Sequence, residues 1–480
     1  MIDQLLDQKI KNWINTHHEE LLDQWMDLVR IPSCRREAAS GAPFGKASRE
    51  VLDAAVAFYH QAGISAEVEK EGHYALARYG QGEKSIGLFG HCDVVEPGDG
   101  WIYTDPFNPI IKDGYMIGRG CGDNKSGVIA SLAAIRIIKE LGIPLKSRLI
   151  AYMGAAEETR MPDMVKFVQQ EEQPDLAFVP DSSFPCSLGE KTILRFFARR
   201  KETFKDIFDF FGGISLNAVL ADATVILKKT EPLVKELSAL IEGDKDYTLT
   251  IEEDAIRLVA HGIPGHAAYA VGSISGAVVA ARLLKDCQNL CKEDRACMAQ
   301  LFEWLEDFHG SGMNIAHEDP DFGKLTLANG IVKTEDGHVS FSTDIRFGIG
   351  LDHQEAEQRL TKLLEDHGWE ITYMSNRKGF RVDPESPLPD RFTALYHELT
   401  GSEGKPYFMA GGTYSRHLKN AFTVGGSAFV KNPTAIRPEL PVGHGGAHQR
   451  DECIPIEGCF QAMRVLTHYI LAADKYLNQE

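Results

Sequence analysis

The chain has 480 residues, of which 43% are hydrophobic and 25% charged. That length exceeds one ordinary hydrophobic core, so we expect a globular protein with two or more domains. Lysine and arginine total 51 against 69 acidic residues, and the formal net charge of −18 argues against nucleic-acid and anionic-membrane partners. No apolar run reaches the length of a membrane span, and the N-terminal segment lacks a signal-peptide core. Nine cysteines without a CxxC pair are typical of free thiols in a reducing compartment, so we expect a cytoplasmic protein.

Helical and strand-like segments alternate between about residues 49 and 185. "REVLDAAVAFYHQAG" predicts a helix, and "AEVEK", "YALARYG" and "SIGLFG" predict strands. "KSGVIASLAAIRIIKELG" predicts a helix that ends at Gly142, and "SRLIAYMG" and "LAFVPD" predict two further strands. This alternation is typical of an open α/β sheet with helices on its faces.

The pattern changes from about residue 188 to 382. "YTLTIEEDAIRLVAHG" and "GIVKTEDGHVSFSTDIRFG" predict antiparallel hairpins, and "GAVVAARLLKDCQNL" and "HQEAEQRLTKLLEDHG" predict helices. Beyond it, the Gly-rich segments "MAGGTYSR" and "FTVGGSAF" precede a final helix. We therefore predict an α+β domain, residues 188–382, inserted into an α/β domain formed by residues 1–187 and 383–480.

Polar residues follow the predicted apolar strands. His91 follows "SIGLFG", Glu157 and Glu158 follow "SRLIAYMG", Asp181 ends "LAFVPD", and Asp123 lies just before a helix. Each has an ordinary explanation, such as a loop histidine, a helix N-cap, a solvated acidic pair or a turn residue. Because open α/β sheets bind ligands beyond the carboxyl ends of their strands, the coincidence favours one shared site.

A histidine and several carboxylates, with a second histidine from the tail, suit Zn²⁺, Mn²⁺ or Co²⁺ better than a metal bound by thiolates. Five ligands suffice for two metal ions if one carboxylate bridges, and Asp123 is the natural bridge. The segment "GRGCGDNKSG" does not fit a phosphate loop, because Asn124 rather than Gly precedes the lysine. The residues alone leave the last ligand open among four candidates, which are His261, His266, His444 and His448.

Seven motifs in order resemble those of M20-type co-catalytic metallopeptidases, and most closely those of PepV-like bacterial dipeptidases. They are "GHCDVV", "GRGCGDNKSG", "AAEE", "VPDSSFP", "GIPGHAAY", "GGTYSR" and "GAHQRDE", and they run from about residue 85 to 455. The resemblance implies a mixed-sheet, zinc-peptidase-like α/β catalytic domain and identifies the inserted α+β domain as a lid.

The resemblance also implies a ligand set for two divalent ions, Zn²⁺ or Mn²⁺. His91 and Asp181 are expected to bind one ion. Glu158 and His448 are expected to bind the other, with Asp123 bridging the two. These assignments select His448 from the four histidine candidates.

Catalytic and substrate-binding roles follow from the same resemblance. Asp93 is expected to orient the imidazole of His91, as carboxylates commonly do for metal-bound histidines. Glu157 is expected to act as the general base towards a metal-bridging water, and His266 to stabilise the oxyanion. The residues expected to bind substrate are Asn217, Arg346, Gly412, Thr413 and Arg416.

The expected reaction is hydrolysis of dipeptides or short peptides with a free C-terminus. The alternatives are an N-acyl amino acid deacylase using the same two ions and a non-catalytic metal-binding scaffold. An enlarged lid favours a monomer, although a homodimer stays open.

Two departures from the family pattern stand out. The lid segment "HAAYAVGSISGA" lacks the usual Ser and Pro, and Cys92 and Cys121 lie close to predicted ligands, which raises the hypothesis of oxidation sensitivity.

Overall fold

The computed structural model describes residues 2–479, and the chain divides into two compact units. The first unit runs to Gly189, resumes over Val382–Tyr407 and continues from Gly412 onwards. The second unit comprises Glu190–Arg381 and Phe408–Gly411. The sequence predicts domain boundaries after residues 187 and 382, and this division into a catalytic domain and an inserted domain stays a prediction.

A six-stranded mixed sheet forms the centre of the first unit. Four neighbouring strands, β6, β3, β7 and β23, are parallel, and β1 and β2 continue the sheet in antiparallel pairing. In sheet order the strands are β1 (Ser65–Val68), β2 (Tyr74–Tyr79), β6 (Arg148–Gly154), β3 (Ser85–His91), β7 (Leu176–Ser182) and β23 (Ala421–Gly425). The predicted mixed-sheet α/β class is confirmed.

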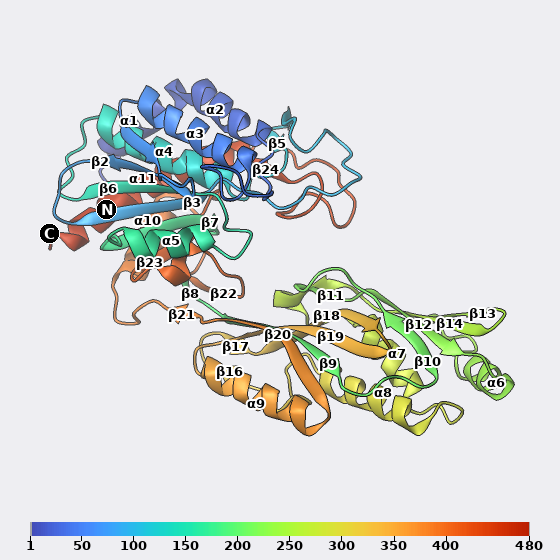
Figure 1. Ribbon diagram of the computed structural model, residues 1–480. Helices are drawn as coiled ribbons and strands as arrows, with labels where there is room; N and C mark the ends of the chain where they lie inside the picture. The colour runs from blue at the N-terminus through green and yellow to red at the C-terminus, as the bar shows by residue number, and fades with distance from the viewer. Residues whose placement is uncertain (1, 480) are drawn as a thin grey trace. The chain divides into compact units, whose positions relative to one another are not determined.

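Helices cover both faces of this sheet, as Figure 1 shows. One face packs against the large hydrophobic core that α4 and α11 share with α1 to α3 and α10, whereas α5 and the 3₁₀ helix η2 contribute to a smaller core on the other face. Alternation along β3 explains the two cores, because Leu88 points into the first and Phe89 into the second. The helices are α1 (Gln4–Thr16), α2 (His18–Arg30), α3 (Lys46–Gln61), α4 (Lys125–Glu140), α5 (Pro162–Gln170), α10 (Leu388–Thr400), α11 (Ile456–Leu477) and η2 (Tyr414–His417).

The segment "FTVGGSAF" differs from expectation. From the sequence it is predicted only as a Gly-rich stretch, but its first half forms β23, which pairs with β7 in parallel and completes the sheet. Residues near the C-terminus also add a strand to a small sheet of β4 (Ile110–Lys112), β5 (Tyr115–Ile117) and β24 (Cys453–Pro455). The tail therefore contributes β23, β24 and α11 to the first unit.

The second unit contains two four-stranded antiparallel sheets with their own hydrophobic core. The predicted hairpins are present as β13–β14 and β18–β19, and both predicted helices are present as α7 and α9. One sheet has the order β18 (Thr326–Glu335), β19 (His338–Phe347), β9 (Thr192–Arg200) and β20 (Trp369–Arg377), and the other has the order β10 (Ile207–Phe211), β12 (Asp222–Lys228), β14 (Ala255–His261) and β13 (Tyr247–Ile251).

The remaining elements of the second unit are short strands and helices. The helices are α6 (Glu231–Leu240), α7 (Gly276–Leu284), α8 (Lys292–Leu305), α9 (His353–Asp366) and the 3₁₀ helix η1 (Ala267–Tyr269). The short strands are β11 (Ala218–Val219), β15 (Gly265–His266), β16 (Glu318–Asp319) and β17 (Gly323–Lys324). Where the chain passes between the units it forms β8 (Ser187–Glu190), β21 (Phe380–Arg381) and β22 (Tyr407–Met409). Within residues 2–479, no helix combines the length and apolar composition needed to cross a membrane.

Candidate metal centre and active site

Three adjacent parallel strands of the first unit deliver polar residues to one edge of the sheet. His91 is the last residue of β3, Asp181 lies at the end of β7, and the loop after β6 carries Glu157 and Glu158. Helix α4 begins at Lys125 with Asn124 in the N-cap position, so Asp123 is not the helix cap. The strand-end pattern in the sequence therefore corresponds to a real convergence in space.

Four of these polar side chains, all except Glu157, form two groups of three together with His448, and the two groups share Asp123. In the first group, His91 Nε2 lies 3.0 Å from Asp123 Oδ1 and 3.7 Å from Asp181 Oδ1. In the second, His448 Nε2 lies 3.1 Å from Asp123 Oδ2 and 2.9 Å from Glu158 Oε1. Within each group the candidate ligand atoms lie within 4.8 Å of one another. Each oxygen of Asp123 thus faces a different histidine, as a bridging carboxylate would.

The pKa values reflect a site with more negative than positive charge. Burial raises the pKa of Glu158 to about 7, with Asp123 adding to the effect against the opposing contacts of His448. Burial lowers the pKa of His448, but hydrogen bonds to Asp123 and Glu158 outweigh it and raise the pKa to about 11. Burial likewise raises the pKa of Asp181. Burial also acts to raise the pKa of Asp123, but its hydrogen bonds to His448 and His91 outweigh burial and lower this pKa. The two imidazoles therefore stabilise the charge of Asp123, and the other carboxylates have too few cationic partners.

The donor set fits two divalent cations. Imidazole nitrogens and carboxylate oxygens are the ligands that Zn²⁺ and Mn²⁺ accept, and none of the clustered ligand atoms is a sulfur. Buried carboxylates that gather without enough cations repel one another, and metal ions at their centre would neutralise them. The ligand assignments from the sequence are therefore geometrically coherent and stay a prediction of metal binding.

Asp93 contacts both the first histidine and the acidic loop. His91 Nδ1 lies 3.0 Å from the backbone oxygen of Asp93 and 3.4 Å from its Oδ1. The Asp93 carboxylate also accepts hydrogen bonds from the backbone N–H groups of Glu157 at 3.0 Å and Glu158 at 3.1 Å. The expected orienting residue therefore fixes the backbone of the two glutamates as well as the imidazole.

Glu157 is nearly buried, with 9% of its surface exposed. Burial raises the pKa of its carboxyl group well above the usual value, and the carboxylates of Asp181 and Glu158 act in the same direction against His91. A raised pKa makes a carboxylate a better proton acceptor near neutral pH. The environment of Glu157 thus suits the general-base role that the resemblance implies.

The two tail histidines, His444 and His448, have different surroundings. His444 Nδ1 lies 2.6 Å from Oδ2 of the buried Asp451, and it is not in either ligand group. His448 has a left-handed backbone (φ 62°), which is uncommon for a residue with a side chain and points to a constrained turn. Its imidazole reaches Asp123 and Glu158, in agreement with the assignment from the resemblance.

Glu452 is a site residue that lies within a recognised motif but has no role predicted from the sequence. Its Oε1 accepts hydrogen bonds from the N–H groups of Gly122 (2.9 Å) and Asp123 (3.0 Å), and its Oε2 accepts from Gly120 N–H and Arg119 Nη1 (both 2.8 Å). Glu452 therefore holds the loop that presents Asp123. The sequence signal for Glu452 is its place as the second of the two acids that end the "GAHQRDE" motif.

A cavity of about 270 Å³ adjoins this site in the first unit. Asp123, Asp181 and Ser182 contribute to its wall, together with the small residues Gly426 and Ser427. A cavity of this size next to the candidate ligands can admit a small polar substrate.

Asn217, which is expected to bind substrate, and His266, which is expected to stabilise the oxyanion, lie together in the second unit. Asn217 precedes β11 and accepts a hydrogen bond at its backbone oxygen from Ala267 N–H (2.9 Å), directly after His266 in β15. The exposed His266 also caps η1, since its Nδ1 accepts a hydrogen bond from Ala268 N–H at 3.1 Å. His261, the other candidate from this motif, contacts Asp222 and Thr248 instead.

Arg346 is a buried strand residue held by an acid of its own strand. Its Nε and Nη2 lie 2.8 and 3.2 Å from the two oxygens of Asp344, and Nη1 donates to the backbone oxygen of Ala410 at 2.9 Å. Arg195 also donates to Asp344 at 2.7 Å. Two guanidinium groups therefore share one carboxylate.

The "GGTYSR" segment lies in the first unit around η2. Thr413 is buried, caps η2 through a hydrogen bond from Ser415 N–H (3.2 Å), and contacts Thr423 Oγ1 at 3.1 Å. A side chain at Gly412 would collide with the guanidinium of Arg416, because a Cβ there would lie 2.0 Å from Nη2. Gly412 thus permits the Arg416 side chain to fold back over the segment.

The oxidation hypothesis for the two cysteines near the ligands is not supported. Cys92 and Cys121 are fully buried, and all nine cysteines are free thiols. Burial raises the pKa of Cys92 to about 12 and that of Cys121 well above its usual value. Oxidation requires an accessible thiolate, so neither thiol is a good target.

Comparison with known proteins identifies the family. The sequence profile of "Peptidase family M20/M25/M40" matches residues 87–472, well over half of the chain. The chain belongs to this peptidase family. The recognition made from the seven motifs is confirmed, as is the assignment of the protein to the metallopeptidase enzymes.

Relatives in sequence and structure agree with the family. The chain is 26% identical over 469 residues to "Putative dipeptidase YtjP" of Bacillus subtilis, covering 95% of this chain and 98% of that protein. It is 26% identical over 432 residues to "Putative dipeptidase SH1171" of Staphylococcus haemolyticus, covering 86% and 91%. Among solved structures, human carnosine dipeptidase 1 superimposes with a TM-score of 0.59 at 16% identity, over 98% of this chain and 99% of that one. That structural likeness shows the shared fold.

Proposed function

We propose that this M20 peptidase hydrolyses the peptide bond of dipeptides and other short peptides with a free C-terminus, using two divalent ions. The observation that carries the proposal is the pair of ligand groups sharing Asp123, with the buried Glu157 on the same loop as Glu158. The dipeptidase names of the two sequence relatives support a dipeptide substrate.

His91 and Asp181 would hold one ion. Glu158 and His448 would hold the other, and Asp123 would bind both. When bound, Zn²⁺ or Mn²⁺ would supply Lewis-acid polarisation of the scissile carbonyl and lower the pKa of the attacking water. The donor set accommodates both metals, so either is compatible with the proposal.

The protein side chains supply the proton transfers. The carboxylate of Glu157 accepts a proton from the attacking water and then donates it to the departing amine nitrogen, which leaves as a neutral amine. Asp93 supports this step by holding the Glu157 backbone N–H and contacting the imidazole of His91. Both actions use residues of the first unit alone.

We assign substrate binding to the residues that the resemblance implies. Arg346 suits the free carboxylate of the substrate, because a planar guanidinium can donate two parallel hydrogen bonds. His266 would stabilise the oxyanion with Asn217 beside it. Gly412, Thr413 and Arg416 would contact the substrate through the η2 segment. A monomer located in the cytoplasm remains our expectation for the assembly and its location.

Hydrolysis of a substrate panel tests the proposal. Metal-free protein is reloaded separately with Zn²⁺, Mn²⁺ or Co²⁺ and offered dipeptides, tripeptides, and N-acetyl and N-succinyl amino acids. We expect release of free amino acids from dipeptides. Turnover of acyl substrates alone would establish the deacylase alternative, and metal binding without turnover of either class would establish a scaffold. A Glu157→Gln preparation run in parallel detects contaminating peptidases.

A further inference from the structure

The loop that carries the two glutamates is held by two buried carboxylates. Asp93 accepts hydrogen bonds from the N–H groups of Glu157 and Glu158. Asp163 Oδ2 accepts from the two preceding N–H groups, those of Ala155 at 2.9 Å and Ala156 at 3.1 Å. Four consecutive backbone amides are therefore fixed in pairs, and only the first carboxylate has a role in the proposed reaction.

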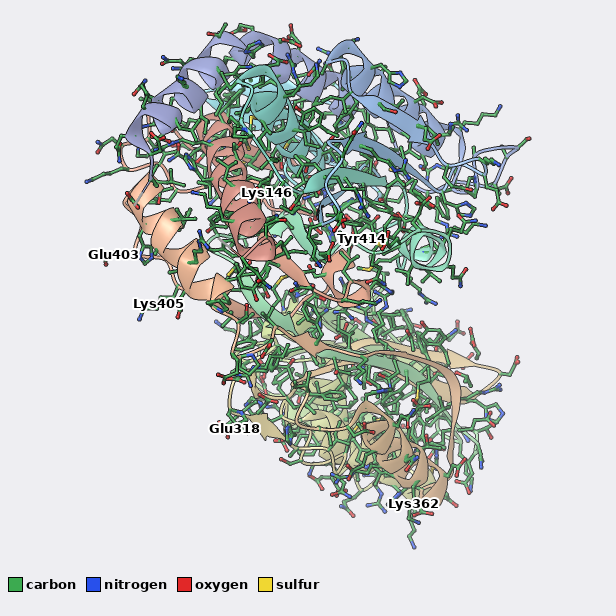
Figure 2. The ribbon with its side chains drawn as sticks, turned by 90° about the vertical axis from the view of Figure 1, so that its left-hand side faces the viewer. Lys146, Glu318, Lys362, Glu403, Lys405 and Tyr414 are labelled. Atoms are coloured by element: carbon green, nitrogen blue, oxygen red, sulfur yellow. The ribbon has the colours of Figure 1, made fainter. Side chains whose placement is uncertain are left out.

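Asp163 is itself held by a tyrosine from a distant part of the sequence. It lies in the first turn of α5, has no exposed surface, and accepts a hydrogen bond from the hydroxyl of Tyr414 at 2.5 Å. Tyr414, labelled in Figure 2, is also fully buried and belongs to the η2 segment. This hydrogen bond joins the glutamate loop to the "GGTYSR" segment, 251 residues further along the chain.

The last residue of β6 makes room for the pair. A Cβ at Gly154 would lie 1.8 Å from the Tyr414 hydroxyl oxygen and 2.5 Å from Asp163 Oδ2. No side chain fits there without displacing one of the two groups. Glycine at this position is thus explained by the close approach of the tyrosine and the aspartate to the strand.

The same loop contains two consecutive strained residues. Arg160 and Met161 both have a left-handed backbone, with φ values of 80° and 58°. Such conformations persist in residues with side chains only where surrounding contacts impose them. Met161 N–H donates to the backbone oxygen of Ala156 at 3.0 Å, so the strained residues are linked to a residue whose own N–H is held by Asp163.

We propose that Asp163 and Tyr414 are a positioning pair that sets the placement of Glu157 and Glu158 through the backbone of their loop. The pair touches neither substrate nor metal in this assignment. It acts through Ala155 and Ala156 N–H, whereas Asp93 acts through the next two amides. This inference rests on the proposed function, because the pair affects the reaction only by placing Glu157, the proposed base, and Glu158, a proposed metal ligand.

Tyr414→Phe is the decisive variant, because it removes one hydroxyl and keeps the ring in its buried place. A misplacement of a catalytic group by about 1 Å can lower a rate by about 10²-fold, so we expect kcat to fall by roughly 10- to 100-fold with KM changed less than about 3-fold. Chelator competition should show one of the two ions bound more weakly, because Glu158 lies on the same loop. Asp163→Asn should have the same pattern and a larger effect.

Tyr469→Phe is the matched control. Tyr469 is fully buried in the same unit, and its hydroxyl donates to the backbone oxygens of Pro185 and Phe392, away from the glutamate loop. We expect a similar loss of thermal stability with kcat close to that of the parent. The double variant of Asp163 and Tyr414 should be no slower than Asp163→Asn alone, since partners that act as one unit are not additive.

The outcomes separate this inference from the proposed function. If Tyr414→Phe keeps the parent kcat while Glu157→Gln is inactive, the positioning pair is wrong and the base assignment stands. An equal fall in kcat for Tyr414→Phe and Tyr469→Phe also overturns the pair, since general destabilisation would explain both. If Glu157→Gln retains full activity, the proposed function itself fails. Should Asp163→Asn not fold, Tyr414→Phe alone decides.

Discussion

Each of the two units buries a group of charged side chains, and the two groups are opposite in charge balance. In the first unit several carboxylates face only two imidazoles, and burial raises the pKa of Glu157 and Glu158. In the second unit the single carboxylate of Asp344 faces Arg346 and Arg195, which outweigh its burial and lower its pKa. Burial alone therefore does not set the direction of a pKa shift, and the balance of neighbouring charges does.

This contrast indicates what each group can bind. The acidic group lacks positive charge and is completed by cations, which is the basis of the two-metal assignment. The basic group already satisfies its one acid and retains surplus positive charge, so it is suited to an anion such as the carboxylate of a peptide. Metal removal and substitution of single residues can alter the acidic group or the basic group separately.

Removal of the metal ions should have the largest effect. Chelation is expected to abolish hydrolysis, and Zn²⁺ or Mn²⁺ should restore it, because five candidate ligands lose their shared charge partner. Ions present at about 100 times their dissociation constant stabilise the folded state by about 2.7 kcal/mol, so the melting temperature should fall on chelation. Hydrogen exchange should accelerate at amides 155–158 and 120–123 and stay unchanged in β19. Full activity of protein shown to be metal-free would contradict the assignment.

Replacing the proposed base should have the next largest effect. Glu157→Gln keeps the size of the side chain but cannot accept a proton, so we expect kcat to fall by roughly 10²- to 10⁴-fold. Metal content, measured by atomic emission, should stay at two ions per chain, because Glu157 is in neither ligand group. Near-parent turnover in this variant would remove Glu157 from its role.

Much of the fold and the site can be predicted from the sequence for a physical reason. Apolar runs such as "SIGLFG" predict buried parallel strands, and such strands end at one edge of their sheet. That rule alone is enough to bring His91, Asp181 and the glutamate pair together. Strand β23 was missed because a five-residue run that ends at a glycine carries little periodic signal. His448 could be selected only through the resemblance, because 290 residues separate it from Glu158.

The residues that hold the loops of the candidate site could not be predicted from sequence patterns. Glu452 and Asp163 act by accepting hydrogen bonds from backbone N–H groups, and every residue except proline offers such a group. No particular side chain is therefore required in the partner segment, and the sequence contains no pair to recognise. For the same reason the double role of Asp93, towards an imidazole and towards two amides, appears only in three dimensions.

Substitution of Arg346 tests the basic group of the second unit. Hydrogen bonds between charged groups contribute about 1.5–3 kcal/mol, so Arg346→Ala should raise KM for a dipeptide by roughly 10- to 100-fold. The same variant should change KM little for the corresponding dipeptide amide, which lacks the carboxylate. A matched control is Arg282→Ala, whose exposed partner in the same unit is Asp246. An equal rise in KM for dipeptide and amide would show that Arg346 does not recognise the carboxylate.

The smallest expected effect concerns the unfolding free energy of the second unit and how it changes as the pH falls. The folded state lowers the pKa of Asp344 below its usual value of 3.8, so the unfolded state binds more protons as the pH falls through this range. The stabilisation is therefore present above the unfolded pKa and is lost as pH falls through the folded pKa. One group can change the slope of unfolding free energy by at most about 1.4 kcal/mol per pH unit.

Asp344→Asn should accordingly be less stable near neutral pH and should lose less stability between pH 5 and 3 than the parent. Fluorotryptophan resonances of the buried Trp304 and Trp369 can follow urea unfolding of this unit at each pH. Asp286→Asn, which breaks an exposed pair with Lys285, is the control and should follow the parent, because exposed pairs contribute little. The contradicting outcome is that the unfolding free energies of Asp344→Asn and the parent change with pH at the same slope. In that case Arg346 and Arg195 do not hold Asp344 ionised, and the contrast in charge balance between the two units is wrong.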